Sequence, residues 1–378
     1  MKIAYLLSSA QFAGAETCFL RFIKKAKRDT NHKFLVVNVE EGPLNDELRR
    51  LEIELYIVRK THVKQVWRNP LIINKSISNY INLYNIIKNF RPDLIHAFTI
   101  HQYRRGAILK TMLHKLKIIV TLHDDLTTQH FSYKHYPIVK SINLFFDKLI
   151  VVSDDVKKIA VENGVRGEKL IRIYNGLPYK PADNKTKNRS HEFVIGCFGR
   201  IVKKKGQHIL IQAVERLRMK IPFIKCYIIG SPLPSATDYY DNLKNCVKEK
   251  NLNNNIIFIG WTDSISMYYS LLDVYVLPSI YPDPFPTVNL EAMMFALPVI
   301  ATDKGGSKEQ VVHNKTGFII KQDSVDELAE KLLFLYENPD QAARMGQKGR
   351  RRVLQNFTMQ QYVKNHFDLY EQIITQNR

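Results

Sequence analysis

The sequence has few cysteines and lacks any long apolar run. The four cysteines are scattered over 378 residues and share no metal-ligand spacing: Cys18, Cys197, Cys226 and Cys246. We therefore expect reduced thiols in the core of a cytosolic protein. The longest apolar runs fall far short of the roughly 20 residues that a transmembrane helix needs, so the sequence predicts no membrane-spanning helix.

Acidic residues are scarce relative to basic ones. The chain has 36 Asp and Glu against 56 Lys and Arg, which gives a formal net charge of +20. This excess favours an anionic partner, and nucleic acid, an anionic membrane surface and a phosphorylated small molecule are all open on charge alone. The sequence contains no recognisable nucleic-acid-reading module, such as an aromatic RNP-type strand, a zinc finger or a basic region with heptads. Nucleic acid is therefore not expected as a partner.

What the sequence does contain is a regular alternation of short β-rich runs and helical stretches. KIAYLLSS is followed by TCFLRFIKKAK, and KFLVVNV is followed by NDELRRLE. Nearly continuous Ile, Val and Leu runs indicate strands that are buried on both faces, which predicts parallel sheets with crossover helices. The expected fold class is α/β, with doubly wound, Rossmann-like sheets.

A polar stretch near the middle of the chain interrupts the alternation. PYKPADNKTKNRSH (178–191) is typical of a linker, and the alternation then restarts with FVIGCFG. We predict one Rossmann-like domain over 1–180 and a second over 190–357, with a last helix over 358–378 that crosses back to the first domain. Ligands of such sheets bind at the carboxyl ends of the strands, so a cleft between the domains is the expected site.

One segment of the second domain suits a diphosphate. CFGRIVKKKGQ (197–207) leaves a predicted strand through Gly199 and carries Arg200 and Lys205 before a helix begins near Gln207. Cations ahead of a helix start offer charge-assisted hydrogen bonds to phosphate oxygens. A lone glycine with a lysine cluster is also typical of a solvated loop, and this segment alone does not separate the two interpretations.

A second segment, DPFPTVNLE (283–291), places a carboxylate on each side of a strand-to-helix junction. Phosphate oxygens could be held by the free N–H groups of the helix start, those of Thr287, Val288, Asn289 and Leu290. Glu291 could then accept hydrogen bonds from a ribose diol, and Asp283 from hydroxyls of an attached sugar. The alternative is a Pro-rich turn followed by an ordinary amphipathic helix.

Together these segments carry a family resemblance. The run 283–291 followed by AMMFALPVIATDKGGSKEQVVHNKTGFII resembles the C-terminal signature of the retaining glycosyltransferases of family 4, which have the GT-B fold. FGRIVKKKGQHILIQA is similar to the family's GR…KG…LI.A segment, and AGAE (13–16) is similar to its N-terminal Gly-rich loop. DLIHAF, VTLHDD, VVSDDVK and IYNGLP follow in the family's order, so the resemblance covers nearly the whole chain.

The resemblance implies roles for residues of the second domain. Arg200 and Lys205 would bind the donor diphosphate and stabilise the leaving nucleotide, where negative charge grows in the transition state. Glu291 would hold the ribose, and Asp283 would hold the transferred sugar. These residues form the implied donor site.

For the first domain the resemblance implies residues that approach the donor phosphates and the reacting sugar. Gly14 would let the N-terminal loop come near the donor phosphates, and His123 would project from the end of the strand IIVTL toward the sugar. Glu16 and His96 are candidates for the acceptor side, although a core position is the simpler interpretation of His96.

The chain departs from the family pattern at three positions. Asp283 stands where the family most often has Glu, and Phe98 replaces a common His. Glu309 matches a position near the nucleobase, but Lys308 stands beside it where Pro is usual. The role of Glu309 therefore does not carry over directly.

The implied function is a retaining transfer of a hexosyl or N-acetylhexosaminyl group. The donor would be a UDP- or GDP-sugar, and the acceptor a hydroxyl of a glycan or of a polyprenyl-diphosphate-linked sugar in bacterial surface polysaccharide assembly (capsule, O-antigen or exopolysaccharide). A double displacement would need a carboxylate at the reacting face, and the first domain offers no clear one. The resemblance instead implies a front-face transfer in which the departing diphosphate takes the proton of the acceptor hydroxyl.

Two alternatives share the fold. A GT-B epimerase or phosphorylase would use the same nucleotide or phosphate site, and a catalytically silent protein would only bind the nucleotide sugar. No lysine is embedded as a cofactor Schiff base, and the adjacent Asp124 and Asp125 lack further metal ligands. We therefore expect neither a cofactor nor a metal.

Basic stretches of the first domain predict peripheral binding to a membrane. YRRGAILKTMLHKLK (103–117) is predicted as a helix whose apolar side faces the sheet, flanked by Arg104, Arg105, Lys110, Lys115 and Lys117. KKAKR (24–28) adds a second basic patch. Each available cation is worth about 1 kcal/mol near an anionic leaflet, so we expect salt-sensitive association with the inner face of the cytoplasmic membrane.

Overall fold

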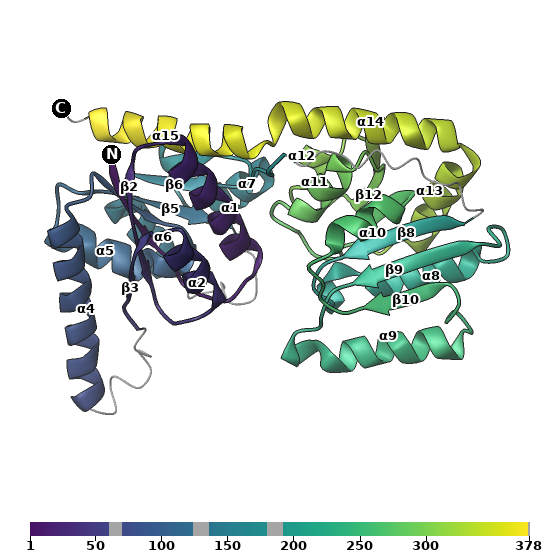
Figure 1. The fold of residues 1–378 in the computed structure, drawn as a ribbon, viewed down its shortest axis with the longest axis horizontal. Helices are drawn as coiled ribbons and strands as arrows, with labels where there is room; N and C mark the ends of the chain where they lie inside the picture. The colour runs from purple at the N-terminus through teal and green to yellow at the C-terminus, as the bar shows by residue number, and fades with distance from the viewer. Residues whose placement is uncertain (60–69, 124–135, 180–191, 377–378) are drawn as a thin grey trace. The chain divides into compact units, whose positions relative to one another are not determined.

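The computed structural model describes residues 1–59, 70–123, 136–179 and 192–376, without the side chains of 70–76 and 136. The chain divides into two compact units (Figure 1). Unit 1 comprises Met1–Pro178 and Met359–Arg378, and unit 2 comprises Tyr179–Thr358. From residue 180 onward, the stretch predicted as a linker lies outside the described residues.

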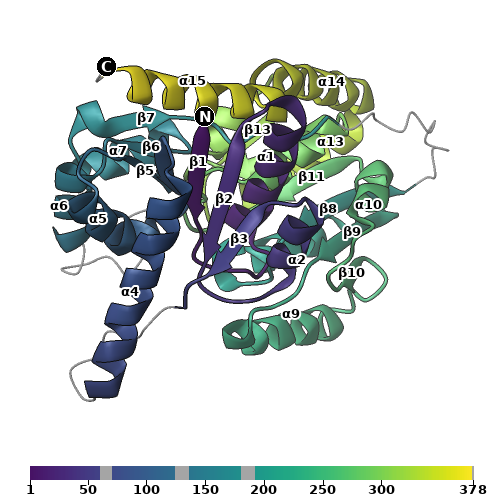
Figure 2. The ribbon, with the colours of Figure 1, turned by 60° about the vertical axis from the view of Figure 1, so that its left-hand side comes forward.

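Unit 1 is built on a seven-stranded parallel sheet in the order β3-β2-β1-β4-β5-β6-β7. Figure 2 shows β1, β2 and β3 side by side. The strands are β1 (Lys2–Leu6), β2 (Lys33–Asn38), β3 (Glu54–Ile57), β4 (Leu94–Ala97), β5 (Lys117–Leu122), β6 (Lys148–Val151) and β7 (Leu170–Arg172). The helices are α1 (Gly14–Asp29), α2 (Pro43–Arg50), α4 (Pro70–Phe90), α5 (Tyr103–Met112), α6 (Tyr136–Phe145), α7 (Asp154–Glu162) and α15 (Met359–Thr375), with short 3₁₀ turns η1 (Ile100–Gln102) and η3 (Gly167–Lys169).

Unit 2 repeats the design with a six-stranded parallel sheet in the order β10-β9-β8-β11-β12-β13. The strands are β8 (Phe193–Phe198), β9 (Ile224–Ile229), β10 (Ile256–Ile259), β11 (Val274–Leu277), β12 (Val299–Thr302) and β13 (Gly317–Ile320). The helices are α8 (Gln207–Leu217), α9 (Thr237–Glu249), α10 (Ile265–Leu271), α11 (Thr287–Met294), α12 (Ser307–Gln310), α13 (Val325–Glu337) and α14 (Pro339–Asn356), with 3₁₀ turns η4 (Lys203–Lys205) and η5 (Pro234–Ala236).

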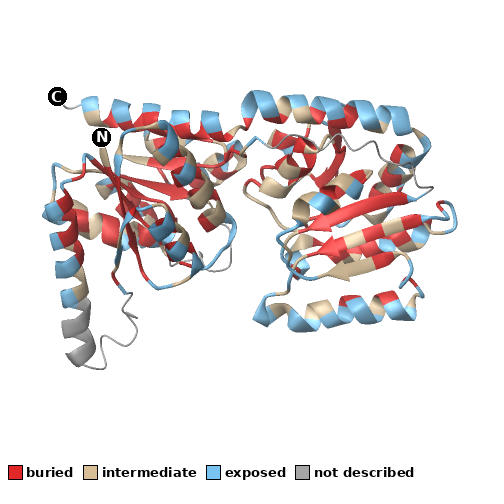
Figure 3. Cartoon of the chain, in the orientation of Figure 1, coloured by how far each residue is buried: buried red, intermediate tan, exposed pale blue. Residues whose placement is uncertain are grey.

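The central strands of each sheet are buried on both faces, which explains their continuous apolar runs, while edge strands such as β3 and β10 are partly exposed (Figure 3). In β1, Ile3 and Tyr5 join a core cluster with residues of α1, α2 and α15, while the alternate residues Ala4 and Leu6 are equally buried. The last helix, α15, packs against α1, as Figure 1 shows within unit 1. The predicted α/β, doubly wound fold class is confirmed.

The strand order reverses once in each sheet, and this reversal locates the candidate sites. In unit 1 it falls between the paired strands β1 and β4, and in unit 2 between β8 and β11. Loops that leave two such strands run in opposite directions, which opens a crevice at their carboxyl ends. Ligand-binding residues are therefore expected directly after these four strands.

The helix predicted over 103–117 is shorter than expected. It ends at Met112, and Leu113 leaves the helical conformation at φ −127° and ψ 61°. A turn closed by a hydrogen bond from the Leu116 N–H to the Leu113 carbonyl then leads into β5, which begins at Lys117. The apolar side is also not fully covered, because Met112 is 45% exposed. The boundary was misplaced because β5 must start at Lys117, only five residues after the last residue of the helix.

The expectation that the cations of 103–117 stay available is wrong for three of them. Arg105 is buried and donates to the carbonyls of Val58 and Arg59. Lys110 and Lys117 both pair with Asp147, at 3.2 and 3.6 Å. These three cations are thus bound to acceptors within unit 1.

The basic patch 24–28 is paired as well. Its cations meet carboxylates of unit 1: Lys24 with Glu47, Lys25 and Arg28 with Asp29, and Lys27 with Glu52. Within the described ranges, none of the helices combines the length and the apolar character needed to cross a membrane.

Candidate functional site

The loops after β8 and β11 of unit 2 carry the residues predicted to bind a diphosphate. Arg200 is exposed just after β8, and the partly buried Lys205 ends η4 directly before α8. Gly206 follows at φ +71°, and a Cβ there would lie 1.9 Å from the Pro278 carbonyl oxygen. Glycine is therefore required where the two loops touch, and the contact brings Lys205 next to the loop after β11.

Lys205 and Asp283, which the sequence assigns to different parts of a donor, pair with each other. The ammonium donates to the Asp283 carboxylate, and each side chain is 18% exposed. Such a partly buried pair balances the charge of the two loops. A diphosphate reaching this loop would present Lys205 with an alternative anionic partner.

The backbone of Asp283 rests on the Gly-Gly turn. Gly305 has φ +69°, and a Cβ there would lie 2.2 Å from the Asp283 carbonyl oxygen. The Gly306 N–H donates to the same oxygen at 2.9 Å. A larger residue at Gly305 or Gly306 would push the Asp283 loop away. The two glycines therefore set the position of the Asp283 carboxylate.

The start of α11 is open to an anion. Its N-cap is Pro286, and no side chain caps the first N–H groups, which leaves Thr287 and Val288 half-buried at the positive end of the helix. The side chains of Asn289 and Leu290 are fully buried, so these two residues could contribute only backbone N–H groups, as the prediction requires. The Asn289 amide donates to Ser307 and Gln310 at 3.2 and 3.0 Å, so its side chain is committed to anchoring α11.

Tyr269 is a residue that the sequence did not point to. It is 2% exposed on α10, and its hydroxyl donates to Oε2 of Glu291 at 3.3 Å. Its ring stacks on Phe295 at 5.2 Å between centroids. The carboxylate predicted to hold a ribose is thus oriented by a buried phenol. No local pattern reveals this, since the two residues are 22 positions apart in the sequence and meet only in the folded chain.

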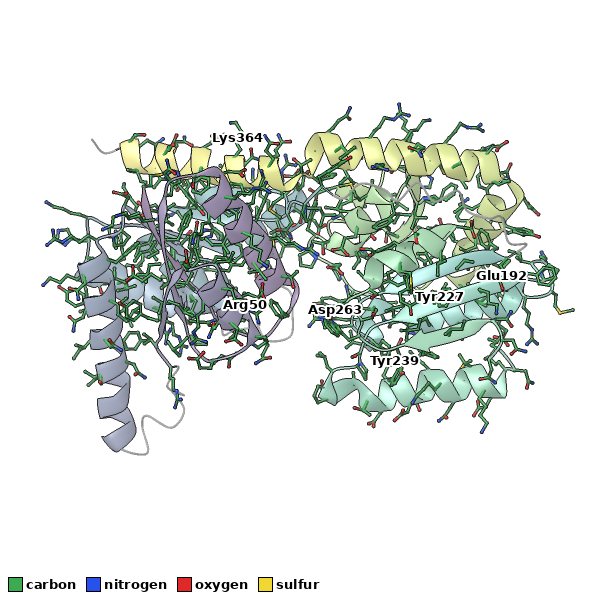
Figure 4. All side chains as sticks on the ribbon, viewed as in Figure 1. Arg50, Glu192, Tyr227, Tyr239, Asp263 and Lys364 are labelled. Atoms are coloured by element: carbon green, nitrogen blue, oxygen red, sulfur yellow. The ribbon has the colours of Figure 1, made fainter. Side chains whose placement is uncertain are left out.

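The first turn of α8 has its own support. Tyr239 of α9, labelled in Figure 4, donates to Oε1 of Gln207 at 3.3 Å and bonds the His208 ring at 3.0 Å. Burial raises the pKa of Tyr239 to about 12, so the phenol stays neutral. The Gln207 amide in turn donates to the Arg200 carbonyl, which braces the loop after β8.

The loop after β1 in unit 1 leads into the start of α1. Gly14 is the first residue of α1, and a Cβ there would meet no described atom within 4 Å. Ala13 gives the helix no side-chain cap, so this helix start is also open. Glu16 is buried in the first turn of the helix.

Three histidines gather in the core of unit 1: His96 on β4, His123 after β5 and His366 on α15. The His96 ring is fully buried and bonded on both sides, to Tyr370 at 2.8 Å and to Thr121 at 2.6 Å. This placement argues against the acceptor-side role and favours the core interpretation of His96. The His366 ring lies 5.8 Å from that of His96.

His123 and His366 each have a buried ring nitrogen, Nε2, without a hydrogen-bond partner among the described residues, and His123 is the one that follows a strand of the sheet. Burial, together with the nearby His366, lowers the pKa of His123 to about 3, so the ring is neutral at ordinary pH. It bonds the Phe98 backbone, and its buried Nε2 has no partner among the described residues. A neutral ring that donates to a carbonyl presents its other nitrogen as an acceptor, which suits a sugar hydroxyl better than a phosphate.

The remaining predictions concern Glu309 and metals. Glu309 is half-buried on α12, and its carbonyl accepts from Arg352. Asp124 and Asp125 lie outside the described residues. Within the described ranges, His, Cys, Asp and Glu residues form no group of three or more that could hold a metal ion.

Comparison with known families identifies the chain. A family profile described as "Glycosyl transferases group 1" matches residues 180–352, and one described as "Glycosyltransferase Family 4" matches residues 12–179. The chain belongs to the family 4, group 1 glycosyltransferases. This confirms the resemblance found in the sequence, and the two matches together leave only the two ends of the chain uncovered.

Sequence relatives of this family occur in bacteria and archaea. The chain is 28% identical over 249 residues to the capsular polysaccharide biosynthesis glycosyltransferase CapM of Staphylococcus aureus, which covers 62% of this chain and 64% of CapM. It is 28% identical over 342 residues to an uncharacterized glycosyltransferase of Methanocaldococcus jannaschii, covering 86% and 92%. The match thus spans just under two thirds of the length of CapM, as it does for a glycosyltransferase of Haemophilus influenzae, at 65%.

Solved glycosyltransferase structures share the fold over the whole chain. Anabaena HepE in complex with UDP-glucose superposes with a TM-score of 0.84 at 26% identity, covering 98% of this chain and all of HepE. HepE in complex with UDP gives a TM-score of 0.86 at 25% identity, with the same coverage. The GT-B architecture expected from the resemblance is confirmed.

Proposed function

We propose that the protein transfers a sugar from a nucleoside-diphosphate sugar to an acceptor hydroxyl. The observation that carries this proposal is the meeting of Lys205, Asp283 and the uncapped start of α11 at the strand reversal of unit 2. A cation, an open helix start and an adjacent carboxylate match a diphosphate with a sugar attached. The family membership and the UDP-glucose complex of the related HepE support this choice.

Unit 2 acts as the donor-binding domain in this proposal. Arg200 and Lys205 bind the diphosphate, and the N–H groups of Thr287 and Val288 add two neutral donors. Glu291, oriented by Tyr269, accepts from the ribose diol. UDP- and GDP-sugars are both candidate donors, since HepE was solved with UDP-glucose and a Mycobacterium tuberculosis relative is named as GDP-mannose-dependent.

The transfer proceeds with retention in this proposal. The acceptor hydroxyl attacks the sugar on the face from which the diphosphate leaves. An oxygen of the departing diphosphate takes the proton of that hydroxyl. Lys205 exchanges the Asp283 carboxylate for the departing phosphate, where the negative charge grows. Asp283 is thereby released to accept from a hydroxyl of the transferred hexosyl or N-acetylhexosaminyl group.

Unit 1 acts as the acceptor-side domain. His123 offers its open Nε2 to a sugar hydroxyl, Gly14 keeps the start of α1 open, and Glu16 remains a candidate on the acceptor side. We propose a glycan or polyprenyl-diphosphate-linked acceptor in bacterial surface polysaccharide assembly. CapM and a mannosyltransferase of lipopolysaccharide core biosynthesis in Rhizobium leguminosarum support this setting.

We also propose a cytoplasmic location with peripheral binding to the inner face of the membrane. The net charge of +20 supports binding to an anionic surface. The surface is narrower than the one that the sequence indicated, since most cations of 24–28 and 103–117 pair within unit 1.

One observation favours a second candidate, a nucleotide-sugar-binding protein without turnover. If Lys205 stayed paired with Asp283 after a donor bound, neither group would assist the transfer. A GT-B epimerase or phosphorylase is the third candidate, and it would act on the sugar without a glycan acceptor.

The test is the release of nucleoside diphosphate from a panel of UDP- and GDP-sugars, with and without a lipid-linked acceptor. Release that depends on the acceptor supports a transferase. If NMR shows that the product linkage has the same anomeric configuration as the donor, the transfer is retaining. Tight donor binding without release would favour the silent binder. Conversion of the donor sugar without an acceptor would favour the epimerase.

A further inference from the structure

Unit 1 has a hollow of about 650 Å³ between the end of α4 and the segment that follows α5. We call it the α4–α5 groove. Its apolar lining includes Met112, Leu113 and Leu116, and its basic side chains include Lys88, Arg91 and Lys115. Met112 is 45% exposed here, which is unusual for so apolar a side chain.

The cations of the groove differ from those elsewhere in unit 1 because they are not neutralised. In the part of the chain that the structure describes, Lys88, Arg91 and Lys115 form no ion pair, whereas Lys110 and Lys117 nearby share Asp147. The carboxylate that lines the groove, Asp93, accepts from the Lys2 backbone N–H at 2.7 Å. The groove therefore carries an excess of positive charge beside an apolar floor.

The groove lies at the amino ends of the strands, the edge opposite to the candidate site. Asp93 directly precedes β4, and Leu116 directly precedes β5. Both strands run from this edge to the one that carries the strand reversal. A ligand in the groove therefore leaves the carboxyl ends of the sheet of unit 1 accessible.

We propose that the α4–α5 groove docks an anionic phospholipid of a membrane. Its phosphate contacts Lys88, Arg91 and Lys115, and the start of an acyl chain covers Met112 and Leu116. The volume is in the range of about 300–1,000 Å³ typical of small-molecule sites. A free phosphate would satisfy the cations but leave the apolar floor exposed, so the combination favours a lipid. This inference rests on the proposed membrane association and names its surface.

The experiment is flotation of the full chain with vesicles of phosphatidylcholine alone or mixed with phosphatidylglycerol. The triple variant Lys88→Gln, Arg91→Gln, Lys115→Gln should lower partitioning onto the anionic vesicles by about two orders of magnitude, since each lost cation weakens it roughly fivefold. The matched control removes three exposed cations of α14 in unit 2: Arg344→Gln, Lys348→Gln, Arg351→Gln. This control should lose far less.

Two further measurements distinguish binding of a phospholipid from binding of free phosphate. Met112→Gln should weaken flotation while leaving the charge of the groove unchanged, and millimolar inorganic phosphate should compete poorly with vesicles. Equal losses in the two triple variants, or no loss in the groove variant, would overturn the proposal. So would full competition by phosphate with no effect of Met112→Gln. Turnover with a water-soluble acceptor should be unchanged in all variants, which distinguishes failure of this proposal from failure of the proposed activity.

Discussion

The strand reversals of the two units have the same topology but opposite chemistry. In unit 2 the crevice carries charge: an exposed arginine, the Lys205–Asp283 pair and an uncapped helix start. In unit 1 the side chains singled out near the reversal are neutral, buried rings: His96 on β4, His123 after the neighbouring β5 and His366 on α15, whose pKa values are all lowered by burial. The architecture fixes where a ligand binds, and the side chains after the strands decide whether it is anionic or uncharged.

Acidification should expose this difference most strongly. Burial lowers the pKa of His123 to about 3 and that of His366 to about 4, and it lowers that of His96 well below the usual 6.5. Below pH 6.5 the unfolded chain binds protons that the folded rings exclude, so the stability of unit 1 falls as the pH falls. At about pH 5.5 each histidine costs roughly 1.4 kcal/mol, about 4 kcal/mol in total.

Peptide-resolved hydrogen exchange at about pH 7.5 and 5.5, corrected for intrinsic rates, measures this effect in each unit separately. Strands of unit 1 should lose protection at the lower pH while those of unit 2 change little. Equal losses in both units would mean that the histidine cluster does not set the acid sensitivity.

The charged crevice should depend on one cation above its neighbours. Lys205→Ala should lower turnover by about two orders of magnitude, the usual cost of removing a group that stabilises developing charge. Lys203→Ala is the matched control, because Lys203 is exposed in the same 3₁₀ turn. Steady-state kinetics with a saturating donor decides the matter. Similar activities in the two variants would remove Lys205 from the mechanism.

Substitutions of Asp283 test whether its carboxylate binds the transferred sugar or only stabilises the turn. Asp283→Asn keeps the size but loses the charged acceptor and the ion pair with Lys205, so a loss of about 1.5–3 kcal/mol in transition-state binding is expected. Asp283→Glu should also impair transfer, because the Gly-Gly turn holds this loop tightly and the longer side chain crowds the sugar. Full activity of the Asn variant with unchanged donor affinity would reduce Asp283 to a turn residue.

Tyr269 should have the smallest effect and the most specific one. Tyr269→Phe removes the hydroxyl that orients Glu291, at a cost of about 1 kcal/mol, so the donor KM should rise about fivefold with kcat nearly unchanged. Tyr268→Phe is the control, since this neighbouring phenol on α10 has no described hydrogen bond to its hydroxyl. A fall in kcat at constant KM would contradict a role in ribose binding.

The fold could be predicted from the sequence because its signal is local. A strand that is buried on both faces needs a continuous apolar run, and such runs in the sequence mark the strands of both sheets. The end of α5 was misplaced because apolar spacing continues through Leu113 and Leu116, although the chain has already turned toward β5. Helix boundaries depend on what the chain must reach next.

The site was predictable only as a set of separate residues. Lys205 and Asp283 were both singled out, but their pairing depends on two loops that meet through Gly206 and Pro278. Tyr269 and His366 escaped notice because each acts through a contact with a distant part of the chain. Spacing along the sequence carries no information about such contacts.

The membership of α15 in unit 1 has a consequence for the order of folding during synthesis. Tyr370 and His366, which complete the core around His96, leave the ribosome only after all of unit 2 has been made. Unit 2 is continuous in sequence and can close its core first, while the earlier-made unit 1 waits for its last helix. We therefore expect unit 2 to complete its core before unit 1, the reverse of the usual order in which the N-terminal domain folds first. Until α15 arrives, the apolar face of α1 and its neighbours is exposed to chaperones and to other nascent chains.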